Sequence, residues 1–135
     1  MRYFVVAVGK AREPFADDQR HYERLLARHA RVDVIEVADD EALQRRIPER
    51  TFVCLLDVRG RVYDSEAFAR WLEQRRQAGR DVCFAIGGPF GTRLEAADER
   101  LSLGPLTLPH LLARVVLLEQ LFRAHKILAG ETYHH

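Results

Sequence analysis

Hydrophobic residues along this chain gather in short unbroken runs that alternate with longer stretches of helical spacing. The first run, YFVVAV at residues 3–8, ends at Gly9 and is typical of a strand covered on both faces. Similar runs predict strands at residues 32–37, 51–56 and 82–86. The strand at 51–56 is expected to close at Asp57 and Gly60, and a fifth short strand is expected within residues 103–108.

The stretches between these runs predict helices. Apolar residues recur at helical spacing over about residues 15–29 and over residues 110–128. A further helix is expected to begin at Asp64 or Ser65 and to stop at Gly79. Two shorter helices are expected, at residues 39–46 and at about 93–100. Alternating strands and helices predict a single α/β domain over residues 1–135, with a mainly parallel sheet flanked by helices.

One uncharged segment does not fit a regular element. Residues 101–113 read LSLGPLTLPHLLA, and Gly104, Pro105 and Pro109 interrupt them. Loops are normally polar, so an apolar loop indicates that its backbone donors and acceptors serve a ligand. In open α/β sheets the ligand crevice lies beyond the carboxyl ends of the strands. We therefore expect residues 56–57, 87–92 and 101–113 to meet at that edge.

The glycines of AIGGPFG, at positions 87, 88 and 91, match neither a Walker loop nor a dinucleotide fingerprint. Two interpretations remain open. The glycines provide the positive φ of a tight strand-to-helix turn, or they allow a ligand to approach the backbone closely. The apolar wall of residues 101–109 suits an uncharged flat ring, such as adenine, better than a phosphate. The segments together predict an adenosine-like ligand.

Composition narrows the class of protein. The net charge is only +1, which excludes a strong overall basic field of the kind that binds nucleic acid. Nineteen of the 21 basic residues are Arg, which suits phosphate and base stacking, although a GC-rich genome explains the same bias. Cys54 and Cys83 lie in apolar runs without metal-ligand spacing, so we expect buried thiols and no metal. Neither a signal peptide nor a membrane span is apparent, and we expect a cytoplasmic protein.

The stretch at residues 110–128 is apolar over most of its circumference, which predicts a helix buried on two sides. We expect one side to face the sheet and the other a second subunit, as a homodimer; a fully internal helix is the alternative. Arg114 and His125 fall within the apolar arc. Arg114 either pairs with a carboxylate such as Asp57 or holds a substrate across the dimer interface. His125 is expected to be either a residue whose hydrogen bonds are satisfied or one that snorkels toward solvent.

Several motifs occur together in order: AVGK, then LD followed by G, GRDVCFAIGGPFG, LSLGPLTLPHLLARVVLLEQLFRA, and YHH near the end. In this order they resemble the RlmH family over nearly the whole chain. The resemblance implies a small SPOUT-class methyltransferase with a C-terminal trefoil knot. It also implies transfer of a methyl group from S-adenosylmethionine to N3 of a pseudouridine in 23S ribosomal RNA. The enzyme would act as a dimer on the large subunit or the whole ribosome.

The resemblance also assigns residues. For the reaction it implies, the candidates are His134 as proton acceptor, Tyr133 for stacking on or orienting the base, and Arg114 for contact with a phosphate or an imide oxygen. The tail of one subunit would complete the partner's site. His110 either caps the last helix or takes part in the chemistry. Backbone groups of three segments would hold the cofactor, namely those of Leu56, Gly88, Leu103, Gly104, Pro105, Leu106, Thr107 and Leu108.

This chain departs from the family pattern in two places. The segment at residues 38–50 looks short and lacks a lysine-containing stretch, and we expect Arg45, Arg46 and Arg50 to substitute for it in RNA contact. The tail also lacks a terminal arginine. Rival interpretations are a non-catalytic protein that binds S-adenosylmethionine or a nucleotide, a ribosome-associated protein that needs no cofactor, and a small-molecule methyltransferase. The candidate RNA contacts are Arg12, Arg20, Arg45, Arg46, Arg50, Arg59, Arg61 and Arg93.

Overall fold

The computed structural model describes residues 1–88 and 92–133. Its centre is a five-stranded sheet with the order β2-β1-β4-β3-β5, in which every neighbouring pair is parallel. This arrangement confirms the predicted α/β class and the parallel sheet. The strands are β1 (Arg2–Val8), β2 (Arg31–Val37), β3 (Phe52–Val62), β4 (Val82–Ile86) and β5 (Glu99–Ser102).

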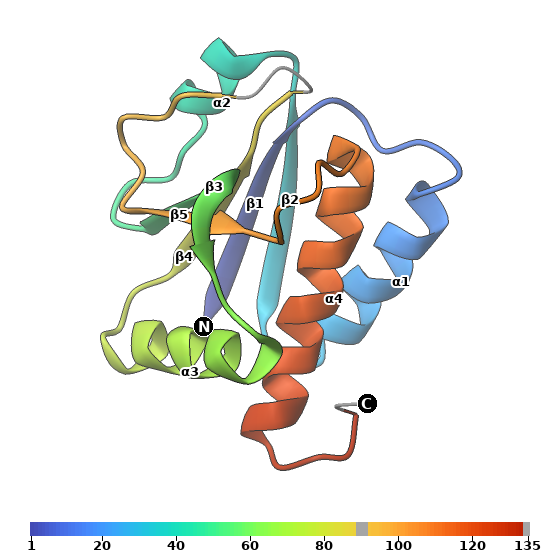
Figure 1. Ribbon diagram of the computed structural model, residues 1–135, viewed down its shortest axis with the longest axis vertical. Helices are drawn as coiled ribbons and strands as arrows, with labels where there is room; N and C mark the ends of the chain where they lie inside the picture. The colour runs from blue at the N-terminus through green and yellow to red at the C-terminus, as the bar shows by residue number, and fades with distance from the viewer. Residues whose placement is uncertain (89–91, 134–135) are drawn as a thin grey trace.

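Four helices cover the two faces of this sheet (Figure 1). Three of them pack on one face, where α4 contacts both α1 and α3. The fourth, α2, lies over the opposite face against β1 and β2. The bounds are α1 (Ala16–Leu26), α2 (Asp40–Arg45), α3 (Ser65–Gln77) and α4 (His110–Leu128).

Alternation along the strands builds two separate cores. In β1, Tyr3 and Val5 belong to the larger core beneath α1, α3 and α4, whereas Val6 belongs to the smaller core beneath α2. Cys83 and Phe84 of β4 divide in the same way. Because both faces are buried, these strands appear in the sequence as unbroken apolar runs.

The predicted helix ends agree closely with the structure. Asp64 caps α3 by accepting a hydrogen bond from the backbone N–H of Ala67 at 2.8 Å. Gly79 follows α3 with a φ of +70°, the conformation in which glycine ends helices. α4 has the predicted bounds, and α1, α3 and the sheet already cover much of its apolar surface within one chain. The predicted second subunit is not needed to bury those residues.

The expected end of the third strand is wrong. β3 continues past Asp57 and Gly60 because β5 pairs with both of its halves across an irregularity. Leu101 pairs with Leu56 and also with Arg61. A Cβ on Gly60 would lie 2.6 Å from the backbone of Arg100. That glycine therefore allows two strands to approach each other closely, and it does not end the strand.

The expected charged helix at residues 93–100 and the strand within 103–108 are also wrong. The fifth strand is β5, at Glu99–Ser102, and residues 103–109 form a loop. Asp98 begins the pairing, because its backbone N–H donates to the Val53 carbonyl and its carboxylate accepts from the Val53 N–H, both at 2.8 Å. Hydrogen bonds to a neighbouring strand thus override the local helical preference.

Candidate cofactor site at the carboxyl edge of the sheet

The loop at residues 103–109 leaves the sheet next to the end of β3, because Ser102 pairs with Val62. Leu56 pairs with Leu101 of β5, and both Leu56 and Leu103 pack against the larger core. Two of the three segments predicted to bind a ligand therefore lie together. The third, which contains Gly88, follows β4, the strand between β1 and β3.

The loop presents uncharged surface. Pro105, Leu106 and Thr107 are exposed, and the Leu106 side chain is 77% exposed. Gly104 has a φ of +126°, and its backbone is held on both sides by Ser102. The Ser102 hydroxyl donates to the Gly104 carbonyl at 2.9 Å and accepts from the Gly104 N–H at 3.1 Å. A fixed apolar loop of this kind suits an uncharged ring.

A cleft of about 350 Å³ opens beside this loop. Its walls come from the end of β3, the start of α3, the Leu103–Gly104 backbone and the middle of α4. The Ser65 hydroxyl donates to the Gln120 side chain at 2.7 Å and ties α3 to α4 in the cleft wall. Neither Ser65 nor Gln120 was among the residues predicted for the site, because nothing in the spacing of the sequence relates α3 to α4.

The two described positions after β4 hold glycine for different reasons. A Cβ on Gly87 would lie 1.7 Å from the hydroxyl of Thr92, which donates to Asp40 at 2.7 Å. Gly87 is therefore required by the packing of the chain itself. A Cβ on Gly88 would lie 3.6 Å from Val8, an ordinary contact, and neither glycine has a positive φ. The interpretation as a positive-φ turn is thus wrong for both, and for Gly88 the close approach of a ligand stays a prediction. Gly91 lies outside the described residues.

The turn after β1 also reaches this edge, although sequence reasoning did not assign it to the site. Gly9 has a φ of +97°, and a Cβ there would lie 3.3 Å from Nε2 of His110. His110 is the first residue of α4, after Pro109, and no side chain caps that helix. The helix-capping role suggested for His110 is therefore wrong. Burial lowers the pKa of His110, and the charges of Arg114 and Arg12 lower it further.

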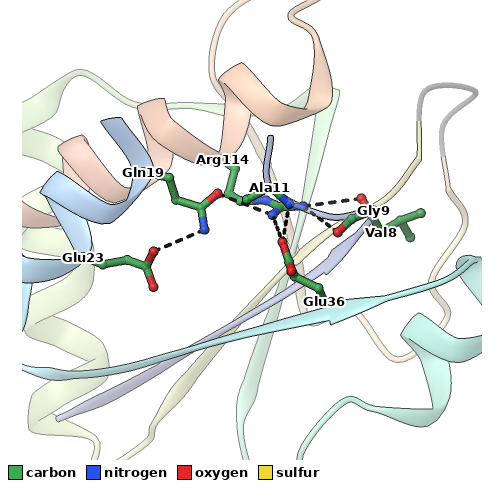
Figure 2. A network of polar contacts seen from close by, with 7 residues as sticks. All are labelled: Val8, Gly9, Ala11, Gln19, Glu23, Glu36 and Arg114. Atoms are coloured by element: carbon green, nitrogen blue, oxygen red, sulfur yellow. Dashed lines mark hydrogen bonds and ion pairs between the residues drawn. The ribbon is translucent and has the colours of Figure 1, made fainter. Parts of the chain in front are cut away.

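Arg114 lies next to this turn and is fully buried. Its guanidinium donates to the Glu36 carboxylate at 2.7 Å and to the carbonyl of Gly9 at 3.2 Å (Figure 2). The suggested partner Asp57 instead contacts Arg59 and Arg100, each at 3.6 Å. A guanidinium with no exposed surface cannot contact an RNA phosphate, so the predicted direct catalytic role of Arg114 is corrected to a structural one.

The described part of the tail folds back on α4. The Tyr133 ring packs edge-on against Phe122 with 4.9 Å between centroids, and the Arg123 guanidinium lies 5.0 Å from its centre. Phe122 is more than three turns along α4 from His110, roughly 18 Å at 1.5 Å per residue. Figure 1 shows the segment after α4 that ends at residue 133 at the opposite end of α4 from the 103–109 loop. His134 lies outside the described residues.

The candidate RNA contacts form two groups. Arg12, Arg46, Arg50 and Arg93 are exposed. The other candidates are exposed arginines in ion pairs, and their partners are Asp17 and Glu13 for Arg20, Glu41 for Arg45, Asp57 for Arg59 and Glu99 for Arg61. Among the described residues, no group of three or more His, Cys, Asp or Glu side chains is placed to hold a metal ion. No helix in the described ranges is long and apolar enough to span a membrane.

Comparison with known proteins identifies relatives over nearly the full length. A family model described as "Predicted SPOUT methyltransferase" matches residues 1–134. The chain is 49% identical to the Ribosomal RNA large subunit methyltransferase H of Rubrobacter xylanophilus, over 98% of each chain. It is 40% identical to the protein of the same name from Gemmatimonas aurantiaca over 99% of each chain. The first alignment spans 154 positions, more than the 135 residues of this chain, so that relative contains segments which this chain lacks.

Proposed function

Because this chain belongs to the SPOUT methyltransferase family, we propose that it methylates N3 of a pseudouridine in the 23S ribosomal RNA of the large subunit. Membership of the family confirms that the chain is a methyltransferase that uses S-adenosylmethionine. It also implies the predicted trefoil knot. The match over residues 1–134 is the observation that carries the proposal, and the names of the relatives support the ribosomal substrate. Such an enzyme would work in the cytoplasm, on the subunit or the whole ribosome.

The residues at the carboxyl edge fit S-adenosylmethionine. The exposed apolar loop suits the adenine ring, and Gly88 leaves backbone accessible where packing within the chain does not require glycine. Bound there, the cofactor supplies an electrophilic methyl group on a sulfonium. The backbone groups proposed to hold it are those of Leu56, Gly88, Leu103, Gly104, Pro105, Leu106, Thr107 and Leu108.

Methyl transfer needs alignment of the acceptor nitrogen with the methyl carbon and the leaving sulfur, in a site that excludes water. The imide N3–H of pseudouridine must also lose its proton. We propose that His134 accepts this proton and that Tyr133 orients the base. His110 lies against the Gly9 turn at this edge, and burial lowers its pKa, so it is a neutral imidazole next to the cradle.

The position of the tail supports action as a homodimer. Tyr133 packs on Phe122, which lies roughly 18 Å along α4 from His110 at the cofactor edge. A tail anchored there reaches a second active site more readily than its own. In the proposed dimer, the tail of each subunit therefore completes the partner's site, and two copies of the exposed Arg12 and Arg93 face the RNA.

The assay uses ribosomes from a strain that lacks the enzyme. Incubation with tritiated S-adenosylmethionine should label the 23S RNA, and nucleoside mass spectrometry should identify N3-methylpseudouridine. Binding of cofactor without label would support a non-catalytic protein instead, and ribosome binding without affinity for cofactor would support the ribosome-associated alternative. Label on a small molecule alone would indicate a different acceptor.

Gly88→Arg tests the site itself. An arginine there should fill the cradle and abolish both cofactor binding and methyl transfer. Ala78→Arg is the matched control, because it adds the same side chain at the exposed end of α3 and should remain active. An active Gly88→Arg enzyme would contradict the assignment of the cofactor site.

A further inference from the structure

One ion pair fixes the turn that follows β1 from both sides (Figure 2). Arg114 of α4 donates to the Glu36 carboxylate on β2, and the same carboxylate oxygen accepts the backbone N–H of Ala11 at 2.5 Å. The other guanidinium nitrogen donates to the carbonyls of Gly9 at 3.2 Å and Val8 at 3.5 Å. Both partners of the ion pair thus bind backbone atoms of residues 8–11.

The same turn touches Gly88 of the proposed cofactor site and His110, which follows the loop of that site. Val8 lies against Gly88, since a Cβ there would be 3.6 Å away from it. Gly9 lies against His110, the residue with which α4 begins after the 103–109 loop. A shift of this turn would therefore change the spacing between the glycine after β4 and the loop before α4.

The stability of the fold does not explain this arrangement. The Arg114 side chain is fully buried and the Glu36 side chain is 35% exposed, and such an ion pair often contributes little net stability, because the charges lose hydration. Nε of Arg114 has no hydrogen-bond partner among the described residues, which is a further cost. An apolar side chain on α4 would fill the same space without these penalties. What it could not do is bind two carbonyls and a carboxylate at fixed positions.

We propose that Glu36 and Arg114 are positioning residues for methyl transfer, which hold residues 8–11 so that Gly88 and the 103–108 loop keep the spacing that S-adenosylmethionine requires. In this role neither side chain needs to touch the cofactor or the RNA. This inference rests on the cofactor cradle of the proposed function.

Glu36→Gln tests the proposal, because the amide keeps the size of the side chain and removes its charge. Calorimetry on the folded protein should show S-adenosylmethionine binding weakened about tenfold. In the ribosome assay KM for the cofactor should rise, while KM for ribosomes stays unchanged. Hydrogen exchange at the Ala11 amide should become faster.

Asp33→Asn is the matched control. Asp33 also lies on β2 and pairs with Arg2 of β1 at 2.8 Å, but at the opposite end of the same two strands. This variant should lose a similar or smaller amount of stability and keep its cofactor affinity. Affinity that fell equally in both variants would indicate a general effect of stability and would overturn the proposal.

Arg114→Lys provides a second variant if Glu36→Gln does not fold. It keeps the positive charge beside Glu36, but an ammonium cannot reach the carboxylate and both carbonyls as a planar fork does. It too should weaken cofactor binding. Unchanged binding in these variants overturns the positioning role alone, whereas a wild-type protein that ignores S-adenosylmethionine overturns the cradle and this inference together.

Discussion

The hydroxyl of Tyr3 lies 2.7 Å from Nε2 of His125 and joins the start of β1 to the last turns of α4. Burial raises the pKa of the Tyr3 phenol, and it lowers the pKa of His125 to about 4. The hydrogen bond therefore joins two neutral groups at neutral pH. His29 stacks on the His125 ring at 5.7 Å between centroids. The charges of His29 and the N-terminal amine lower the pKa of His125 further, and that of Glu73 raises it. His125 is only partly buried, and its Nε2 has a hydrogen-bond partner, which agrees with the expectation of a residue whose hydrogen bonding is satisfied.

This pair predicts a loss of stability in mild acid. The pKa of His125 is lower in the folded chain than its ordinary value near 6.5, so the unfolded chain binds the proton more readily. The contribution is complete above about pH 6.5 and is lost as the pH falls toward 4, by about 2 kcal/mol for this partly exposed ring. Denaturant unfolding at a series of pH values measures it. His125→Gln should flatten the slope over this range, and an unchanged slope would contradict the assignment.

The close approach of β3 and β5 at Gly60 predicts a difference between two glycines. Gly60→Ala should lower the free energy of unfolding by about 2 kcal/mol, because its Cβ would overlap the Arg100 backbone. Gly88→Ala should change it by less than about 0.5 kcal/mol, since its Cβ would meet Val8 at an ordinary distance. Urea unfolding of both variants checks the pair. Equal losses would show that Gly60 is not specifically required.

The proposed exchange of tails predicts that two inactive variants restore activity together. Gly88→Arg subunits lack a cradle, and subunits with Tyr133→Ala and His134→Ala lack a functional tail. A mixed dimer of the two contains one complete site. Equal mixing should therefore recover about a quarter of the wild-type rate in the ribosome assay. Mixtures as inactive as the separate variants would show that each tail serves its own chain.

The burial of the two cysteines predicts that their thiols are unreactive in the native protein. Cys54 and Cys83 are fully buried, and burial raises the pKa of Cys83 to about 12 and that of Cys54 further. Only a thiolate reacts readily with a disulfide reagent. The folded protein should therefore show no fast-reacting thiol, and both should react in denaturant. Fast labelling under native conditions would mean that the sheet opens at β3 and β4.

The structure also shows where local sequence patterns were sufficient. α4 was predicted with its observed bounds, because a long apolar stretch that starts after Pro109 depends little on distant residues. The capped start of α3 at Asp64 was predicted for the same reason. Residues 93–102 were misassigned because β5 forms only by pairing with β3, some 45 residues earlier in the chain.

The sequence by itself determined the α/β class, the first four strands, the uncharged loop before the last helix and, through its motifs, the resemblance to a methyltransferase family. Each of these depends on the residue types within one short window. Only the tertiary structure showed that Arg114 pairs with Glu36, and that Gly87 and Gly88 are glycines for different reasons. Those facts depend on which atoms from other segments of the chain lie within a few ångströms of each residue. No local pattern records that.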